Sequence, residues 1–213
     1  MNLSIGLEDI DRDPGLITVT ARLRSGQMVV FRPLAGGDAR TLGQYFLGLS
    51  AATRALYAPH PFDQATADEL CRNVRDSDAT RMIAVARSGD GERIIAYFIV
   101  LWHVQESDVE RYAQRGTILD SGTDCTLAPS VADEYQNQGL GSAMMEHILG
   151  VARRLGRRRM VLWGGTRATN ERAIHFYEKF GFRKVGEFLI GALNNYDMLL
   201  EIQKPEHRAE DER

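Results

Sequence analysis

Two glycines, Gly139 and Gly141, stand one residue apart between the polar stretch Gln136-Asn137-Gln138 and an apolar pattern with helical spacing. Glycine loses more conformational entropy on folding than other residues, so a pair at the start of a helix needs a physical reason. The first amide groups of a helix have no partner within it and lie at the positive end of its dipole. Without side chains at the two glycines, a phosphate can reach these amides. The pair therefore predicts a ligand that carries phosphate, with a pyrophosphate as the best match.

Two common phosphate-binding motifs do not fit this segment. The chain has no Gly-Lys-Ser or Gly-Lys-Thr after a glycine loop, which argues against an ATP-binding P-loop. The dinucleotide fingerprint needs a third small residue, where this sequence has Met144, and an acidic residue about twenty positions further on, where it reads RRRMVLW. Two interpretations remain at this point: a phosphate cradle of another class, or a glycine turn that binds no ligand.

A second motif follows the glycines. Asn170, Ala173 and Tyr177 precede the segment EKFGF, and a buried-strand pattern, MVLWG, separates the two motifs. Together they resemble the GNAT superfamily of N-acetyltransferases, which carries Q/R-x-x-G-x-G/A between a strand and its helix. The glycine segment supplies the matching positions of that pattern, Gln136, Gly139 and Gly141. The resemblance spans roughly residues 30–202. Because the members of this superfamily use acetyl-CoA, the resemblance implies that this chain uses it as well.

The resemblance implies acetyl transfer from acetyl-CoA, as co-substrate, to a primary amine by direct attack in a ternary complex, with no metal. The residues expected to bind the cofactor lie on the strand before the glycines, in the glycine segment and at the start of the next helix: Val131, Gln136, Gln138, Gly139, Leu140, Gly141, Ser142 and Asn170. The amides of residues 138–142 would bind the pyrophosphate of CoA, and Gln136 would orient the segment. Asn170 would hydrogen-bond the pantetheine, and a backbone amide near Val131 would polarise the thioester carbonyl.

Tyr177 is the expected general acid, because a phenol can give its proton to the departing thiolate. Core packing is the alternative role of this side chain, since it shares a helical face with Ala173 and Phe180. Two other classes of function also stay open. One is a non-catalytic acyl-CoA-binding sensor, and the other is a nucleotide-binding enzyme that uses the glycine loop for a different phosphate.

The general base is the weaker part of the pattern. The family often places a glutamate on the strand before the glycine loop, and the corresponding position here is Thr126, which cannot serve. Asp124 lies two residues away on the same strand face and is the candidate base, directly or through water. A solvated strand end is the other interpretation of Asp124, and Glu106 and Asp108 are weaker candidates.

Three further segments lie near these motifs. His60, between two prolines, borders the region of the acceptor pocket in the family, and is either a substrate contact or a loop histidine with no special role. The Asn194-Asn195-Tyr196 segment is expected as a loop that closes over the acceptor. The arginines in 153–159 form either a solvated helix end or a site for the 3′-phosphate of CoA or for a nucleic acid.

Hydrophobic periodicity indicates the elements that must position these residues. β-Hairpins are expected around Ser25-Gly26 and over 81–102, and a strand at 124–131 that Pro129 marks as an edge or a bulge. Helices are expected over about 38–57, over 63–74, and from Thr169 or Asn170 onward. Another helix is expected from residue 140, with its apolar face formed by Leu140, Met144, Met145, Ile148, Leu149 and Ala152.

This order of elements predicts an α/β (mixed α+β) fold, with a GNAT-like central mixed β-sheet of about six to seven strands flanked by helices. The resemblance adds a splay between the strands beside the glycine loop. Residues 15–203 are expected to form a single GNAT-like acyltransferase domain. They follow a flexible N-terminal segment, 1–14, and precede a flexible charged tail, 204–213.

Composition limits the class of protein. The chain has 213 residues, a formal net charge of −3 and 44% hydrophobic residues, which is typical of a soluble globular protein and not of a nucleic-acid binder. No apolar run is long enough to cross a bilayer, and the first residues lack the pattern of a signal peptide, so a cytoplasmic protein without a membrane partner is expected. Cys71 and Cys125 are expected to be small buried residues. The acceptor, a small-molecule or protein amine, stays open, as does the oligomeric state, with a homodimer as one option.

Overall fold

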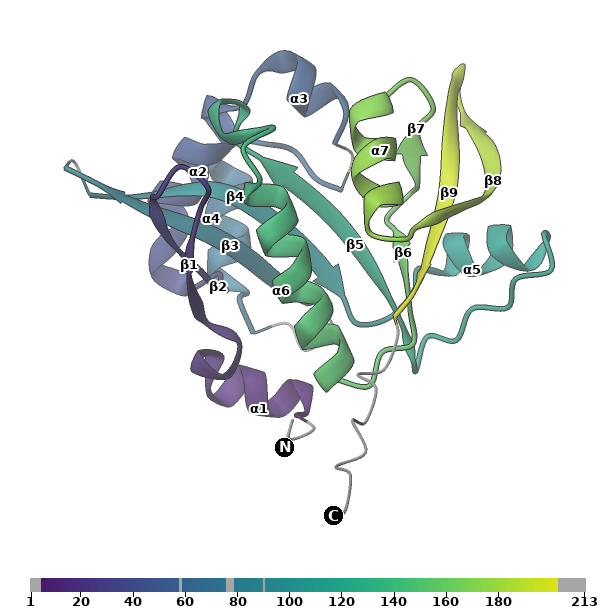
Figure 1. Cartoon of the computed structure of the whole chain (residues 1–213), viewed down its shortest axis with the longest axis horizontal. Coiled ribbons are helices and arrows are strands. Elements are labelled where there is room, and N and C mark those ends of the chain that lie inside the picture. The colour runs from purple at the N-terminus through teal and green to yellow at the C-terminus, as the bar shows by residue number, and fades with distance from the viewer. Residues whose placement is uncertain (1–4, 58, 76–78, 90, 203–213) are drawn as a thin grey trace, which may run out of the picture.

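The computed structural model describes residues 5–57, 59–75, 79–89 and 91–202. Over these residues one mixed sheet has the strand order β1-β2-β3-β4-β5-β6-β9-β7, and β8 pairs with the remaining edge of β9 (Figure 1). The strands are β1 Val19–Arg22, β2 Met28–Pro33, β3 Ala79–Ser88, β4 Gly91–Leu101, β5 Asp124–Val131, β6 Arg159–Leu162, β7 Thr166–Arg167, β8 Arg183–Ile190 and β9 Leu193–Glu201. All neighbours are antiparallel except β5 and β6, which are parallel and joined through a helix.

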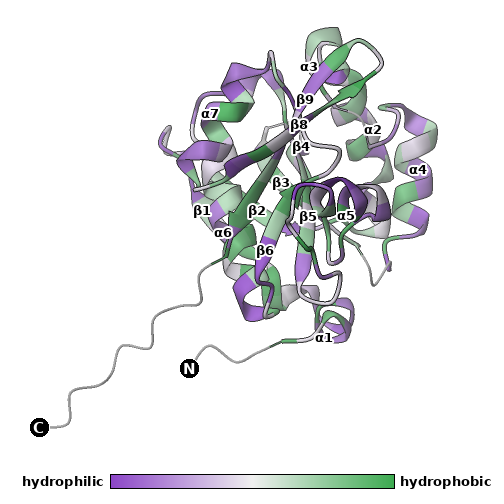
Figure 2. Cartoon of the chain, turned by 90° about the vertical axis from the view of Figure 1, so that its right-hand side faces the viewer, coloured by the Kyte–Doolittle hydropathy of each residue, from purple (hydrophilic) through white to green (hydrophobic). Residues whose placement is uncertain are grey.

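Helices cover both faces of this sheet. They are α1 Leu7–Arg12, α2 Ala39–Gly48, α3 Ala51–Ala55, α4 Gln64–Arg72, α5 Glu106–Ala113, α6 Leu140–Arg154 and α7 Glu171–Lys179, with short 3-10 turns at Pro14–Ile17, Gly36–Asp38 and Asp133–Tyr135. One hydrophobic core joins α1, α6 and α7 to one face, and a second joins α2 and α4 to the other. A smaller third cluster places α5 against β6 and β9. The central strands between these layers are largely hydrophobic (Figure 2).

Local signals account for the two helices that flank the expected site. All six apolar positions predicted on α6 are buried, because they recur at helical spacing on the face that meets the sheet. Helix α7 begins after Asn170, whose side-chain oxygen accepts a hydrogen bond from the Ala173 amide at 3.2 Å. Asp63 caps α4 in the same way, through the Thr66 amide. These helix starts are confirmed as predicted.

Strands β5 and β6 separate beside the glycine segment, which confirms the expected splay. Their parallel ladder has only four residue pairs, from Asp124 opposite Arg159 to Leu127 opposite Leu162. Beyond Leu127, β5 continues to Val131 with β4 as its only paired strand among the described residues. The far end of β5 therefore has a free edge that faces the opening between the two strands.

Backbone alternation fixes which groups point into this opening. The Ala132 amide donates to the Ile95 carbonyl of β4 at 2.9 Å. Because the direction of the backbone groups alternates along a strand of an antiparallel pair, residues 127, 129 and 131 of β5 direct their backbone polar groups away from β4. The Leu127 carbonyl accordingly accepts from the Trp163 amide at 2.9 Å. The Val131 amide points into the opening by the same alternation. Pro129, which lacks an amide, sits at this free edge and not at a bulge, so no ladder bond is lost.

The fold agrees with the expected class, and one expectation about it needs correction. The sheet has nine described strands, somewhat more than the six to seven expected; β7, a pair of residues, has no signature in the sequence. A flexible N-terminal segment is wrong for Leu7–Arg12, which forms α1 and buries Ile10 in the core beside α6. The helical stretch expected over 38–57 consists of two helices, which break at Leu49-Ser50. The expected tail, 204–213, lies outside the described residues, as do residues 1–4.

Both cysteines are buried and free, as predicted. Over the described ranges, no helix is both long and apolar enough to cross a membrane.

Candidate active site

A cavity of about 470 Å³ occupies the opening between β5 and β6. Its walls come from both hydrophobic cores: Tyr177 and Val131 pack with the core beside α6, whereas Tyr57 and Trp163 pack with the core beside α2 and α4. The cavity therefore passes through the sheet. The glycine segment lies at one end, and residues that follow α3 lie at the other. Two molecules that enter from opposite faces can meet inside it.

The glycine segment forms the cavity wall at the α6 end. Gly139 precedes α6 with φ +87°, a left-handed conformation that glycine adopts without strain, and Asn137 has φ +60°. Gly141 lies inside the first turn of α6, and the atoms nearest to a Cβ built on it would be those of Phe176 and Val131, each at 3.6 Å. The fold itself therefore tolerates a side chain at Gly141. The open space above its amide fits a ligand that approaches the start of the helix closely.

Gln136 ties this segment to its surroundings. Its Nε2 donates to the Val131 carbonyl at 3.0 Å and to Thr53 Oγ1 at 3.4 Å, and its Oε1 accepts from Arg172. One side chain thus connects the end of β5, helix α3 and the first turn of α7. This arrangement is suited to the orienting role expected of Gln136.

Three cations line the cavity near the glycine segment. Arg24 lies closest to Gly139, Arg172 contacts Gln136, and Lys179 donates to Ser142 Oγ at 3.0 Å. Together with the free amides at the start of α6 they form a positive field. A ligand with several phosphates fits this end of the cavity.

Six of the eight expected cofactor-binding residues line the cavity: Val131, Gln136, Gly139, Gly141, Ser142 and Asn170. The other two do not. The side chain of Gln138 donates to the Glu134 carbonyl, and Leu140 is fully buried in the core, so only their backbone amides remain available for a ligand. The side-chain oxygen of Asn170 caps α7, which leaves the NH₂ group of the side chain available to donate a hydrogen bond to a ligand.

Tyr177 lies in the cavity wall and is buried. Its ring packs against Phe176 and Phe182, with centroids 5.4 and 5.5 Å apart, so both roles expected of it, core packing and cavity chemistry, are compatible with its position. Burial raises the pKa of the phenol well above its ordinary value. The hydroxyl is therefore protonated at neutral pH and can donate a hydrogen bond or a proton.

Asp124, the expected base, lies in a buried ion pair and not in the cavity. Its side chain is fully buried, outside the cavity lining, and binds Arg159 at 2.6 and 3.1 Å and the Asp120 amide at 2.8 Å. It is neither a free base nor a solvated strand end. Thr126 donates to the His103 carbonyl at 3.0 Å. The paired carboxylate has a structural role, joining the start of β5 to β6.

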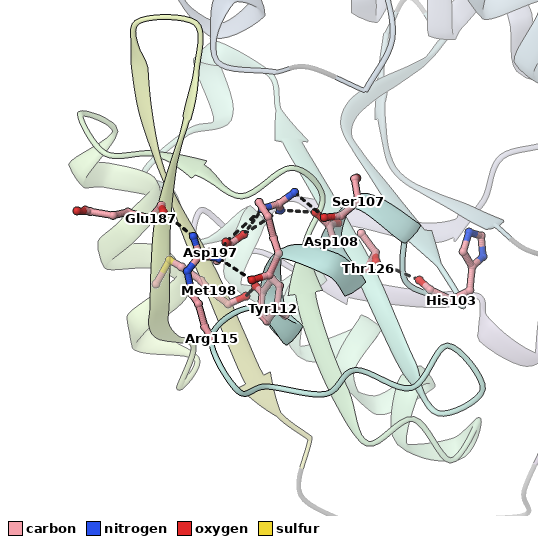
Figure 3. A network of polar contacts seen from close by, with 10 residues as sticks. His103, Ser107, Asp108, Tyr112, Arg115, Thr126, Glu187, Asp197 and Met198 are labelled. Atoms are coloured by element: carbon pink, nitrogen blue, oxygen red, sulfur yellow. Dashed lines mark hydrogen bonds and ion pairs between the residues drawn. The ribbon is translucent and has the colours of Figure 1, made fainter.

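Asp108, one of the weaker candidates, belongs to a second ion-pair network (Figure 3). Arg111 contacts both Asp108 and Asp197, and Arg115 donates to Asp197 at 2.8 Å and to the Glu187 carbonyl at 2.5 Å. Burial, the largest effect, raises the pKa of Asp108. This network fastens α5 to the β8–β9 hairpin. Among the described residues that line the cavity, none is Asp or Glu.

His60 and the segment Asn194–Tyr196 are also expected near the acceptor. His60 lies outside the cavity lining and contacts the Tyr97 hydroxyl through Nε2 at 3.2 Å, and burial lowers its pKa. Asn194–Tyr196 belong to strand β9 and not to a loop, although Asn195 lines the cavity.

The arginines of 153–159 are largely committed to the fold. Arg154 and Arg157 donate to the Leu16 and Gly122 carbonyls, each at 2.8 Å, and Arg159 pairs with Asp124. No described group of three or more His, Cys, Asp or Glu residues could hold a metal ion.

Among the lining residues that were missed from the sequence are Tyr57, Trp163, Gly165 and Arg167. A Cβ on Gly165 would lie 2.6 Å from the Tyr196 carbonyl, so this glycine permits the close approach of β9. The tract WGGTR overlaps the end of the strand predicted at MVLWG, and the paired glycines there were the available signal.

Comparison with known proteins agrees with this architecture. Residues 51–182 match the model of the Acetyltransferase (GNAT) family. The alanine N-acetyltransferase of ribosomal protein bS18 from Escherichia coli (strain K12) is 33% identical over 97 residues, which cover 46% of this chain and 60% of that relative. An acetyltransferase of Pseudomonas aeruginosa is 30% identical over 142 residues, 65% of this chain and 67% of its own length.

Solved structures show the same fold. The GNAT domain of S. lividans PAT superposes with a TM-score of 0.67 at 21% identity, covering 88% of this chain and 98% of that domain. The E. coli enzyme that acetylates ribosomal protein S18 superposes with a TM-score of 0.57 at 20% identity, covering 85% and 98%. Because the family model matches more than half of this chain, the chain belongs to the GNAT family of acetyltransferases.

Proposed function

We propose that this protein transfers an acetyl group from acetyl-CoA to a primary amine by direct attack in a ternary complex. The observation that carries the proposal is the cavity through the sheet, which has a phosphate-compatible helix start at one end and a protonated tyrosine in its wall. Acetyl-CoA fits this arrangement by its chemistry. Its pyrophosphate suits the amides of residues 138–142, and its narrow pantetheine suits the space between β5 and β6.

Backbone groups of β5 and side chains of α7 would hold the pantetheine. The Val131 amide points into the opening and is free of β4, so it can donate to an acyl oxygen as an oxyanion develops. The NH₂ group of Asn170 is the second donor on the same path. Acetyl-CoA supplies the acetyl group as a reactive thioester.

Tyr177 would act where the carbon–sulfur bond breaks. The amine nitrogen forms the new C–N bond, the thiolate leaves, and the Tyr177 hydroxyl donates its proton to the sulfur. The proton lost by the nitrogen can return to Tyr177 or leave through the cavity mouth. An acceptor with the pKa of lysine, near 10.4, must first lose a proton, at a cost of roughly 4–5 kcal/mol at neutral pH. Since no described carboxylate lines the cavity, we assign this deprotonation to water and not to Asp124.

A second candidate function rests on that same lack of a carboxylate in the described lining. A non-catalytic acyl-CoA-binding sensor would need the phosphate cradle but no base. It would bind acetyl-CoA and release no CoA with any amine.

Calorimetric titration with acetyl-CoA, CoA, NAD and ATP is the first test. Binding of the two CoA species alone, followed by thiol release with at least one member of an amine panel, supports the transferase. Binding without release from any amine favours the sensor. Failure to bind acetyl-CoA refutes both, and binding of NAD or ATP in its place would show that the glycine segment serves another phosphate.

A further inference from the structure

One cation of the cavity is not accounted for by the phosphates of CoA. Arg24, Arg172 and Lys179 gather at the glycine segment, whereas Arg167 lies on β7. Arg167 pairs in register with Asn195 of β9, and directly opposed residues of an antiparallel pair point to the same side of the sheet. The side on which Arg167 lies therefore follows from that of Asn195.

Alternation along β9 gives that side. Leu199 packs with the α5 cluster and Asp197 pairs with arginines of α5, whereas Met198 and Leu200 pack with the core beside α6. Asn195 is in phase with Asp197, so Asn195 and Arg167 face the side of the sheet that carries α2, α4 and α5. This is the side opposite the glycine segment, where an acceptor would enter.

Part of the Arg167 guanidinium is unsatisfied within the described part of the chain. Its Nη1 is buried without a hydrogen bond, and the described residues offer it no ion pair. Acidic side chains on the same face already pair with other arginines, because Arg111 binds Asp108 and Asp197 and Arg115 binds Asp197 (Figure 3). Within the described residues, Oδ2 of Asp108 is left without a hydrogen bond. A half-buried guanidinium with an unsatisfied donor is costly, and a carboxylate on a ligand satisfies both its charge and its geometry.

A second unsatisfied donor lies on the same side of the sheet, since Tyr57 packs with the core beside α2 and α4. The Tyr57 hydroxyl lines the cavity from the segment after α3, and it is buried without a hydrogen-bond partner among the described residues. Burial raises the pKa of this phenol, so it remains a donor. Two unsatisfied donors, one of them cationic, match an anionic group with two oxygens that can accept hydrogen bonds.

We propose that the acceptor carries a carboxylate near its reacting amine, and that Arg167 and Tyr57 bind this carboxylate. The assignment rests on the proposed transferase function and names its substrate class: an amino acid, or a peptide whose second residue is acidic. It disfavours polyamines, since the described lining offers such a cation no carboxylate and presents Arg167 instead.

The test compares acceptors that differ in one carboxylate, with kcat/KM expressed per unprotonated amine because amidation of an amino acid also lowers the pKa of its α-amine. Each amino acid is assayed beside its amide, and amidated peptides with Asp at the second position are assayed beside those with Asn, with spermidine as the polycation. We expect the carboxylate member of a pair to be favoured by roughly 10- to 100-fold in kcat/KM, as for a charge-assisted hydrogen bond. Preference within the amino-acid pairs or within the peptide pairs identifies the source of the carboxylate.

Matched arginine variants locate the effect. Arg167→Gln should abolish the preference and leave the Kd for acetyl-CoA unchanged, and Arg167→Lys should restore part of the preference. Arg172→Gln, on the opposite face, should weaken acetyl-CoA binding and keep the preference. Equal use of acids and amides, a preference for spermidine, or weaker acetyl-CoA binding by Arg167→Gln would overturn the assignment.

Failure of the transferase proposal would be distinguishable. If acetyl-CoA binds but no acceptor is acetylated, the same pairs are titrated by calorimetry onto the CoA-bound protein. Selective binding of the carboxylate member to wild type and not to Arg167→Gln then supports the carboxylate site without turnover. Equal or absent binding refutes it.

Discussion

A negative charge at Gly141 should separate the stability of the fold from ligand binding. The residue lies in the first turn of α6, and a Cβ there meets its neighbours at 3.6 Å, an ordinary contact distance. Gly141→Asp replaces glycine with a better helix residue and adds an anion at the positive helix end. We expect the variant to be roughly 0.5–1 kcal/mol more stable than wild type.

The same carboxylate should repel the pyrophosphate of CoA. Two negative charges about 5 Å away, at an effective dielectric constant of about 40, give a repulsion of roughly 3 kcal/mol, or about 200-fold in Kd. Thermal denaturation would measure the stability, and calorimetry with acetyl-CoA the affinity. The loss should shrink as salt concentration rises, because part of the interaction is exposed to solvent.

Gly141→Asn is the matched control, since it has the same shape without the charge. It should retain most of the affinity if electrostatic repulsion dominates. Equal losses in the two variants would show that crowding and not charge limits binding. Undiminished affinity of Gly141→Asp, with the fold intact, would refute the phosphate cradle at the start of α6.

Three further variants test other parts of the structure. Tyr177→Phe should lower turnover by about 100-fold while acetyl-CoA affinity stays nearly constant; intact turnover would assign the side chain to packing. Asp124→Asn, which leaves Arg159 without its buried partner, should cost roughly 2–4 kcal/mol of unfolding free energy with no change in the shape of the pH–rate profile. A changed profile would return Asp124 to the mechanism. Burial lowers the pKa of His147, so the folded state binds fewer protons than the unfolded one and stability falls as pH drops below about 6.5. Urea unfolding of His147→Gln, which can still donate to the Ile17 carbonyl, should show a weaker pH dependence, and an unchanged slope would contradict this account.

The features that follow from the amino-acid sequence alone are local. The start of α6 after Gly139, the cap of α7 at Asn170 and the buried face of α6 all depend on residues within a turn or two of one another. Helix capping, positive φ and helical periodicity are short-range effects, so spacing along the chain reveals them. The glycine segment and the tyrosine of α7 are therefore recognisable as a candidate site from that spacing.

Contacts between distant segments determine what those elements meet. Asp124 stands on a plausible strand face, but its partner Arg159 lies 35 residues away, across a parallel ladder whose two strands are joined by α6. The side on which Arg167 lies depends in turn on its register with Asn195 in β9. Pairing between distant strands sets the direction of every side chain along them, and composition does not encode that register. The cavity through the sheet and its unpaired donors arise from this long-range pairing.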